Sequence, residues 1–301
     1  MPTPEAAAGR PTGRPETSLA EQPGSSSVGK PETGTRLSAS EIHDNVMSEA
    51  DEELERAAAS LLISSFTSGL AIGFSFLGGA YASGLVPPAY GPAAASAAYP
   101  LGFIFVIMAR SELFTENTLT PVLPLLHRRD VVTLVKMLRV WGLLLAGNLL
   151  GTLLFAWVMA RTPAIGRPLQ ASMLQMAERA TDLRFSLTLY HAIFAGWLIA
   201  LLTWVLASTR QTGAQLVLIW LLTAPISAFE FKHSIVGSSE AFYRAWAGSA
   251  GWEPMISFIA AAVIGNAIGG VMLVAILNYG QVVTERKEKG QEQTEVAEKK
   301  S

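Results

Sequence analysis

The chain has 301 residues, of which 50% are hydrophobic and only 15% are charged, whereas a soluble domain carries roughly 25% charged residues. The net charge of −2 leaves no basic surface to neutralise phosphates, which excludes nucleic acid as a partner. There is no cysteine, so disulfides, thiolate metal sites and cysteine nucleophiles are excluded.

The two ends of the chain are polar. Residues 1–45 are rich in Pro, Gly, Ser, Thr and Glu, which predicts a disordered tail, because such a segment cannot bury enough apolar surface to offset its ordering entropy. This segment also lacks the apolar core of a signal peptide, so the first hydrophobic helix is expected to be an uncleaved membrane signal. Residues 285–301 are expected to form a charged C-terminal tail, which leaves 46–284 as the transmembrane domain.

Between the tails, the hydrophobic segments predict six membrane spans. Each has the roughly 20 apolar residues that a bilayer requires, if the two interrupted spans are counted as paired half-helices. We expect the acidic stretch Ser48–Glu53 to open the first helix. The expected spans cover about 57–84, 93–126, 140–160, 185–207, 214–247 and 255–279.

Polar residues interrupt the second and fifth spans. The first break is Ser111–Asn117 (Ser-Glu-Leu-Phe-Thr-Glu-Asn), and the second is Phe229–Ser234 (Phe-Glu-Phe-Lys-His-Ser). In each, the first Glu is followed 35 residues later by Gly-Asn-x-x-Gly. Polar groups at membrane depth are costly and usually mark a permeation path. Two such breaks in corresponding halves indicate a transport site at a repeat interface.

A constant offset supports the repeat. Moving along the chain by 118 residues carries Glu112 onto Glu230, Thr115 onto His233, and the first Gly-Asn-x-x-Gly onto the second. The sequence therefore predicts an all-α membrane protein built from an inverted three-helix repeat, with broken second and fifth helices. Lys and Arg are more frequent on the side of the N-terminus, so both termini are expected in the cytoplasm.

His233, Lys232 and Glu230 are the charged or titratable candidates of the second break. His233 is interpreted as a proton donor or relay, since imidazole titrates near physiological pH; the alternative is a packing hydrogen bond between helices. Lys232 would attract anions if it is unpaired, but it could instead pair with Glu230. The sequence leaves that choice open.

The first break offers a hydroxyl and two large apolar side chains. Thr115 could contact the permeating species or bond His233, while Thr115 or Asn117 could instead cap the half-helix expected near residue 118. Leu113 and Phe114 could form an apolar constriction or could be ordinary core residues.

Two asparagines complete the polar candidates. Asn148 and Asn266 lie between the glycines of the Gly-Asn-x-x-Gly motifs and are expected to hydrogen-bond the loops of the breaks.

These motifs together resemble the formate/nitrite transporter family over about residues 50–284, and within it a less characterised branch typified by an inner-membrane protein of enteric bacteria. The resemblance implies an aquaporin-like protomer with one pore, assembled as a homopentamer in the lipid of the inner membrane. Family members pass small monovalent anions such as formate, nitrite, lactate or hydrosulfide, often coupled to protons.

The resemblance also implies roles for particular residues. His233 matches the central histidine of the family, Thr115 the loop threonine, and Leu113 and Phe114 the constriction. By spacing, three further apolar or aromatic residues fall where pore-lining residues lie, and a basic residue before the fourth span would attract anions at the outer mouth. These four are Tyr99, Phe103, Ile226 and Arg184.

The chain departs from the family pattern at the breaks. Lys232 stands where the family has Glu before the central histidine, which reverses the local charge, and Glu116 stands where it has Gly.

The function expected from the sequence is a channel or proton-linked carrier for a small monovalent anion. The alternatives are a pore for neutral solutes or gases, and a non-transporting sensor or scaffold that uses the N-terminal tail. No nucleophile–base pairing, metal cluster or cofactor fingerprint appears, so neither an enzyme nor a cofactor is expected.

Overall fold

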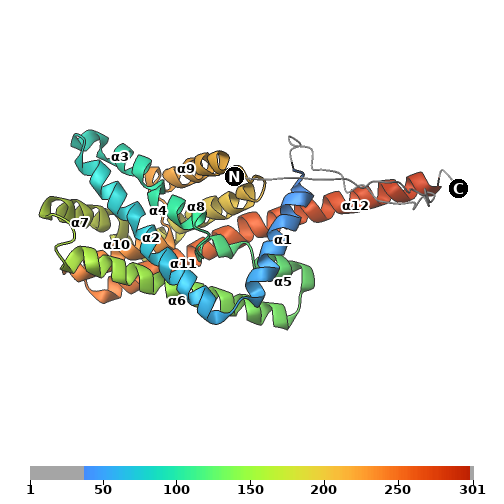
Figure 1. Ribbon diagram of the computed structural model, residues 1–301, viewed down its shortest axis with the longest axis horizontal. Coiled ribbons are helices and arrows are strands. Elements are labelled where there is room, and N and C mark those ends of the chain that lie inside the picture. The colour runs from blue at the N-terminus through green and yellow to red at the C-terminus, as the bar shows by residue number, and fades with distance from the viewer. Residues whose placement is uncertain (1–36, 299–301) are drawn as a thin grey trace, which may run out of the picture. The chain divides into compact units, whose positions relative to one another are not determined.

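The computed structural model describes residues 37–298, and all regular structure in this part is helical (Figure 1). Most of the segment expected as a disordered tail lies outside the described residues. Helix α1 (Ala39–Glu55) nevertheless begins before the boundary expected at residue 45.

Helix α1 is a separate amphipathic helix ahead of the first membrane helix. Ser38 and Glu41 form a capping box at its start. Its buried residues follow helical spacing on one face: His43, Val46, Ala50 and Leu54. The acidic stretch 48–53 therefore lies inside α1, and the expectation that it opens the first membrane helix is wrong.

Five helical segments are long and apolar enough to cross a membrane. One of them combines the 3₁₀ helix η1 (Pro88–Tyr90) with α3 (Gly91–Ala98) and α4 (Pro100–Met108). The other four are α2 (Ala58–Gly84), α6 (Val131–Arg161), α8 (Phe185–Leu206) and α11 (Trp252–Gly270). These segments make the chain an integral membrane protein.

The region expected as the fifth span is divided into two helices. The apolar helix α9 (Thr212–Ala228) is followed, after the second break, by α10 (Ser234–Ala247).

The remaining helices refine the expected connections. The first break leads through η2 (Glu116–Thr118) into α5 (Val122–Arg128), so the half-helix expected near residue 118 starts later. The segment between the third and fourth expected spans contains α7 (Arg167–Thr181). The π-helical segment η3 (Val271–Ile276) joins α11 to α12 (Leu277–Glu298), which runs through the polar C-terminal segment.

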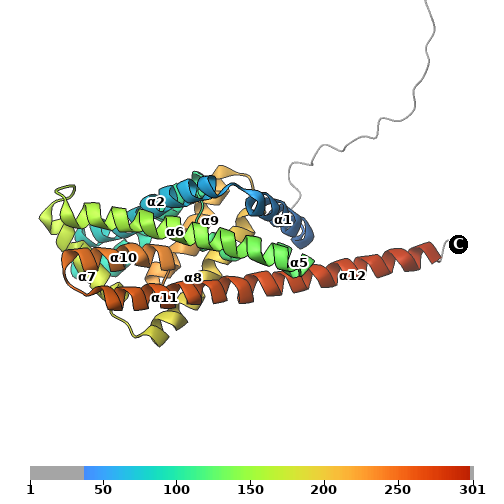
Figure 2. The ribbon, with the colours of Figure 1, turned by 90° about the horizontal axis from the view of Figure 1, so that it is seen from below.

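Two helix pairs pack very closely, α2 with α6 and α8 with α11 (Figure 2). A Cβ atom added to Gly69 of α2 would lie 2.3 Å from the backbone oxygen of Asn148 in α6. A Cβ atom added to Gly196 of α8 would lie 2.2 Å from the backbone oxygen of Asn266 in α11. Small residues thus let the backbones touch at both crossings, as is common between membrane helices.

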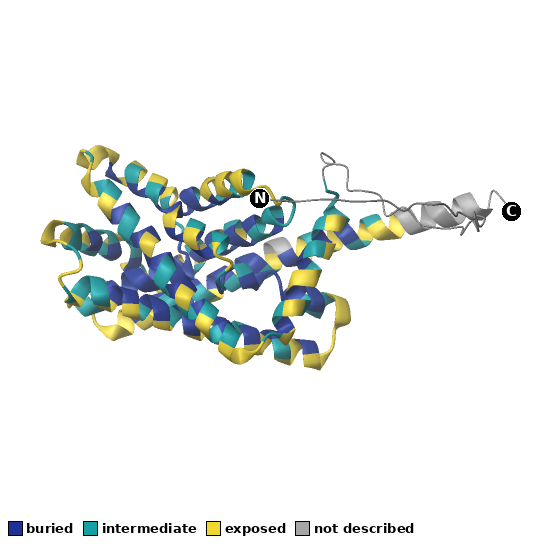
Figure 3. Cartoon of the chain, viewed as in Figure 1, coloured by how far each residue is buried: buried dark blue, intermediate teal, exposed yellow. Residues whose placement is uncertain are grey.

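Many large apolar side chains are exposed. Figure 3 shows that buried residues gather where the helices meet. Ile63, Val217 and Leu221 are all more than half exposed. In water, so many exposed large apolar side chains would favour aggregation. Facing lipid, the same surface carries no such cost.

Candidate functional site

In both breaks, a residue that is not glycine adopts a left-handed backbone conformation. Arg110 follows the end of α4 with φ 53°, and Glu230 follows the end of α9 with φ 57°. Such angles are uncommon outside glycine, so surrounding contacts must hold the backbone in place.

An asparagine from α6 holds the first break. The side-chain oxygen of Asn148 accepts the backbone N–H of Phe114 at 2.8 Å. Its amide nitrogen donates to the backbone oxygens of Glu112 (3.0 Å) and Ser65 (2.8 Å). The side chain of Asn148 thereby joins the break to α2.

An asparagine from α11 holds the second break in the same way. The side-chain oxygen of Asn266 accepts the backbone N–H of Ser234 at 2.7 Å. Its amide nitrogen donates to the backbone oxygens of Lys232 (2.9 Å) and Ala192 (2.7 Å). Both asparagines thus make the contacts with the breaks that the sequence led us to expect.

These hydrogen bonds correct the expected register of the breaks. Glu112 corresponds to Lys232, and Arg110 to Glu230. Equivalent residues of the two breaks are therefore separated by two residues more than the 118 residues that separate Asn148 from Asn266. Thr115 and His233 are not equivalent positions, although they contact each other.

His233 lies between the two breaks with both ring nitrogens engaged. Its Nε2 lies 2.7 Å from Oγ1 of Thr115, and its Nδ1 accepts the backbone N–H of Val236 at 3.1 Å, which caps the start of α10. Since an N–H is donated to Nδ1, that nitrogen carries no proton, and the neutral ring has its proton on Nε2. Nε2–H therefore donates to Thr115.

The Thr115 hydroxyl faces His233 and does not cap a helix. Thr115 precedes η2 without a side-chain capping bond, and α5 is preceded by Pro121. Having accepted from His233, the hydroxyl still has a hydrogen to donate, and within residues 37–298 no protein acceptor for it is found.

Aromatic rings surround the histidine. Phe103 packs edge-on against His233 at 4.9 Å between ring centroids, and Tyr99 packs against Phe103 at 5.6 Å. Both residues expected from spacing thus lie in the same cluster as the histidine.

The other expected apolar residues are also enclosed. Leu113, Phe114 and Ile226 are buried, and Phe114 packs against Trp141.

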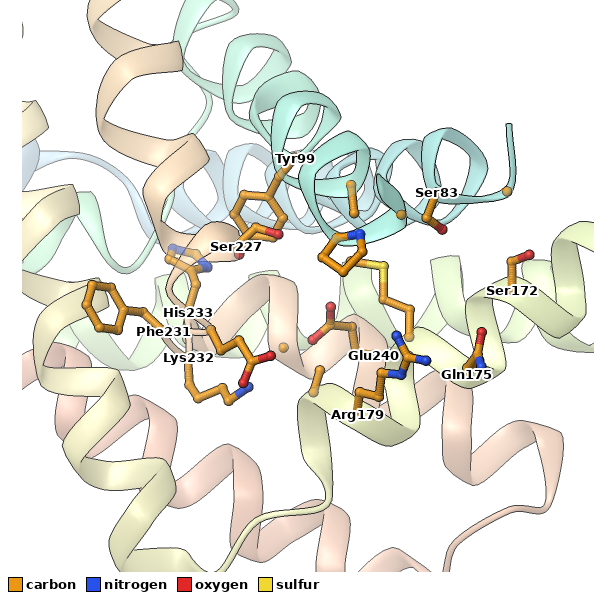
Figure 4. Close-up of a pocket in the computed structure, with 18 of the residues that line it drawn as sticks. Ser83, Tyr99, Ser172, Gln175, Arg179, Ser227, Phe231, Lys232, His233 and Glu240 are labelled. Carbon is orange, nitrogen blue, oxygen red and sulfur yellow. The ribbon is translucent and has the colours of Figure 1, made fainter. Parts of the chain in front are cut away.

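A cavity of about 430 Å³ opens beside His233 (Figure 4). Its walls come from the ends of α2 and α9, from η1 and α3, from α7, from the second break and α10, and from Phe258 of α11. Its charged or hydrogen-bonding lining residues include Tyr99, Arg179, Ser227, Glu230, Lys232, His233 and Glu240.

Lys232 and Glu240 are the two buried charged residues of this lining, each only 6% exposed. The described part of the chain contains no ion pair within 4.0 Å that includes Lys232, so the salt bridge with Glu230 that the sequence left open is not formed. Glu240 was missed at the sequence level. In the structure it lies in a half-helix whose residues from Ser234 to Tyr243 are all buried, and no motif of the sequence reveals this burial.

Two of the expected residues lie away from the cavity. Asn117 donates to the Glu112 carboxylate at 3.1 Å and accepts the Thr120 hydroxyl at 2.7 Å, which fastens the first break internally. Arg184 is exposed at the start of α8 and does not line the cavity. The basic residue that does lie at the opening is Arg179 of α7.

Known proteins share both the sequence pattern and the fold. The sequence profile described as formate/nitrite transporter matches residues 40–280. The inner membrane protein YfdC of Escherichia coli is 32% identical over 85% of this chain and 84% of its own length. The formate channel BtFdhC of Bacillus thuringiensis is 25% identical over 79% of this chain and 93% of its own length.

Solved structures have the same fold. An ion channel described as belonging to the FNT family superposes with a TM-score of 0.73 at 19% identity, covering 80% of this chain and 98% of that chain. A pentameric formate channel with formate bound superposes with a TM-score of 0.61 at 17% identity, covering 75% and 98%. With the family profile matched over most of its length, the chain belongs to the formate/nitrite transporter family.

Proposed function

We propose that the protein is a membrane channel or proton-linked carrier for a small monovalent anion of a weak acid. The observation that carries the proposal is the hydrogen bond between Thr115 and His233, which joins the two breaks at membrane depth. Buried polar groups at such depth are rare unless they serve a permeation path. The formate channels among its relatives support a carboxylate or similar anion as the substrate.

The chemistry of the pair suits such a substrate. His233 donates Nε2–H to Thr115, which leaves the hydroxyl hydrogen of Thr115 free to be donated to the permeating species. The apolar side chains Phe103, Leu113 and Phe114 disfavour a bare ion, because a charge in apolar surroundings is costly without a partner. The species that passes them is therefore the neutral acid, formed by proton uptake at or near His233.

The wider architecture is part of the proposal. We infer six spans, with α9 and α10 together forming the fifth, and two inverted three-helix halves. The matching hydrogen bonds of Asn148 and Asn266 support the repeat. The pentameric relative supports a homopentamer with one pore per protomer. Because YfdC is named an inner membrane protein, we place this chain in the inner membrane, with both termini in the cytoplasm.

The test is anion flux in proteoliposomes. Wild-type protein should pass at least one of formate, nitrite, lactate or hydrosulfide, with proton movement recorded by an internal pH dye. The Thr115→Ala and His233→Ala variants should lower that flux at least about tenfold, the loss expected when a hydrogen bond in the transport step is removed. Control liposomes carrying Glu253→Gln, an exposed position on α11, should match wild type.

Two other outcomes would replace the proposal. Glycerol or ammonia flux without any anion flux would make the protein a neutral-solute pore. A cellular phenotype of the gene deletion could also be rescued by a pore-blocked variant but not by a variant that lacks residues 1–36. That result would make the protein a sensor or scaffold.

A further inference from the structure

Lys232 and Glu240 are a basic and an acidic side chain that line the same buried cavity without contacting each other. Both are only 6% exposed, and both line the cavity beside His233. Figure 4 shows their side chains extending toward the same open space, with Arg179 beyond Glu240 as seen from Lys232. Among the described residues, neither side chain makes a hydrogen bond or an ion pair within 4.0 Å.

A buried charge without a partner is expensive, so something in the cavity must complete this pair. The ammonium and carboxyl atoms are not among the fully enclosed polar atoms without a partner, so they border open space instead of apolar protein. A cavity of about 430 Å³ has room for a small carboxylic acid together with water.

His233 is poorly placed to supply the proton that a weak-acid anion needs. Its Nδ1 caps α10, and its Nε2–H is donated to Thr115. Giving up that proton, or gaining one on Nδ1, would break one of these bonds. A second proton source on the cavity side would avoid this loss.

We propose that Lys232 and Glu240 form a second binding site, at which a small carboxylate binds the Lys232 ammonium and takes a proton from the Glu240 carboxylic acid. The proposal rests on the proposed function and deepens it. The O–H bond of Glu240 breaks as an O–H bond forms on a carboxylate oxygen of the substrate. The neutral acid moves on to Thr115 and His233, while the new Glu240 carboxylate is stabilised by Lys232.

The cycle closes when a proton from the solvent, relayed by water that enters past Arg179, binds the Glu240 carboxylate. The titratable or charged groups that face Glu240 across the cavity are Lys232, Glu230 and His233 from the second break, Tyr99 beside α4, and Arg179 from α7. Helices α2, α6 and α11 also pack against α10, but in the described part of the chain they add no charged residue to the cavity.

The experiment measures formate uptake into proteoliposomes at about pH 5 and about pH 8. These two values were chosen because buried carboxyl groups can titrate in the neutral range between them. Glu240→Gln should lower the maximum rate at least about tenfold at the higher pH and should also lower KM, because Lys232 then lacks its counter-charge. Lys232→Met should raise KM with a smaller effect on the maximum rate. Glu240→Asp, which keeps an acid at the same place, should restore much of the rate.

The outcomes separate this proposal from the function on which it rests. If Thr115→Ala abolishes formate flux while Glu240→Gln stays within about twofold of wild type at both pH values, the second site is refuted and the anion pore stands. If wild type carries no anion, both proposals fail. Glu253→Gln is the matched carboxyl control.

One further test uses the wild-type protein and so does not depend on a variant being able to fold. Dicyclohexylcarbodiimide modifies protonated carboxyl groups, so peptide mass spectrometry of the wild-type protein should find Glu240 labelled, and formate should reduce the labelling. If Glu240 remains unlabelled at every pH tried, it does not hold the proton that this proposal requires.

Discussion

Asn148 and Asn266 bind the two breaks through the same three kinds of hydrogen bond. Each accepts one backbone N–H of its break, donates to the carbonyl two residues earlier, and donates to a carbonyl of the neighbouring helix. One side chain thus satisfies a buried N–H and a carbonyl in each break, as buried backbone groups require.

Replacing either asparagine by alanine should destabilise the protein, because each change leaves one buried N–H and one buried carbonyl of a break without the partner that the asparagine supplies. A stranded buried group costs about 1–3 kcal/mol. Asn266→Ala should also reduce transport more than Asn148→Ala, since the groups that Asn266 holds, Lys232 and Ser234, flank His233. Thermal unfolding in detergent and formate flux at a permissive temperature measure the two effects.

The control for this pair is Asn45→Ala on α1, where a partly buried side chain donates to a single carbonyl, that of Ala207. It should shift the unfolding temperature less than either break variant. Equal stability of all three proteins would mean that the breaks do not depend on the asparagines.

The close helix crossings give a second prediction. Gly69→Ala and Gly196→Ala would each place a methyl group within 2.3 Å of a backbone oxygen, which the facing helices cannot accommodate without separating. Overpacking typically costs about 1–3 kcal/mol, so both variants should unfold at lower temperature.

Gly142→Ala on α6 is the matched control, because nothing lies within 4 Å of its added Cβ and alanine favours the helix. It should unfold at the wild-type temperature or above it. A loss of stability in Gly142→Ala as large as in the crossing variants would show that helix packing is not the cause.

Much of this fold follows from hydrophobic length and from polar interruptions. The spans predicted near 57–84 and 185–207 agree with α2 and α8 to within a few residues. A long apolar run is a reliable signal because about 20 apolar residues in a helix are needed to cross the bilayer. The register of the breaks was wrong by two residues. Side-chain similarity paired Glu112 with Glu230, whereas the backbone groups that an asparagine binds set the true correspondence with Lys232.

Only some residues of the candidate site could be predicted from the sequence. His233 and Thr115 stand in recognisable motifs, and their contact was one of the interpretations considered. Glu240 belongs to no motif, and its importance depends on α3 and α7 closing a cavity around it. Arg179 was missed for the same reason, because it lies between two expected spans and belongs to no motif.

The dual role of His233 gives a third prediction. Asparagine is a good N-cap residue, so His233→Asn should keep α10 capped, while His233→Ala should lose about 1 kcal/mol of stability. Neither variant can offer Nε2–H to Thr115, so formate flux should fall to a similar low value in both. Thermal unfolding and flux on the same preparations separate capping from transport.

Ser38→Ala, which removes the cap of α1, is the control for the capping loss alone and should leave flux closer to wild type than either His233 variant. Wild-type flux in His233→Asn would mean that the histidine serves only as a cap.

The last prediction concerns how pH acts on α1. Burial, and then the negative charge of Glu112, raise the pKa of Glu53 well above its usual value, and one of the Glu53 carboxylate oxygens is fully enclosed. Between the ordinary pKa of a glutamate and this raised value, the folded protein binds more protons than the unfolded chain. The contribution of Glu53 to stability therefore falls as pH rises through that window. Hydrogen exchange of peptides from Ala39–Glu55, corrected for intrinsic rates, should show protection of α1 decreasing accordingly. Glu53→Gln should flatten this dependence and raise protection near neutral pH, while the exposed control Glu52→Gln should retain the wild-type slope; identical slopes in Glu53→Gln and wild type would rule Glu53 out as its cause.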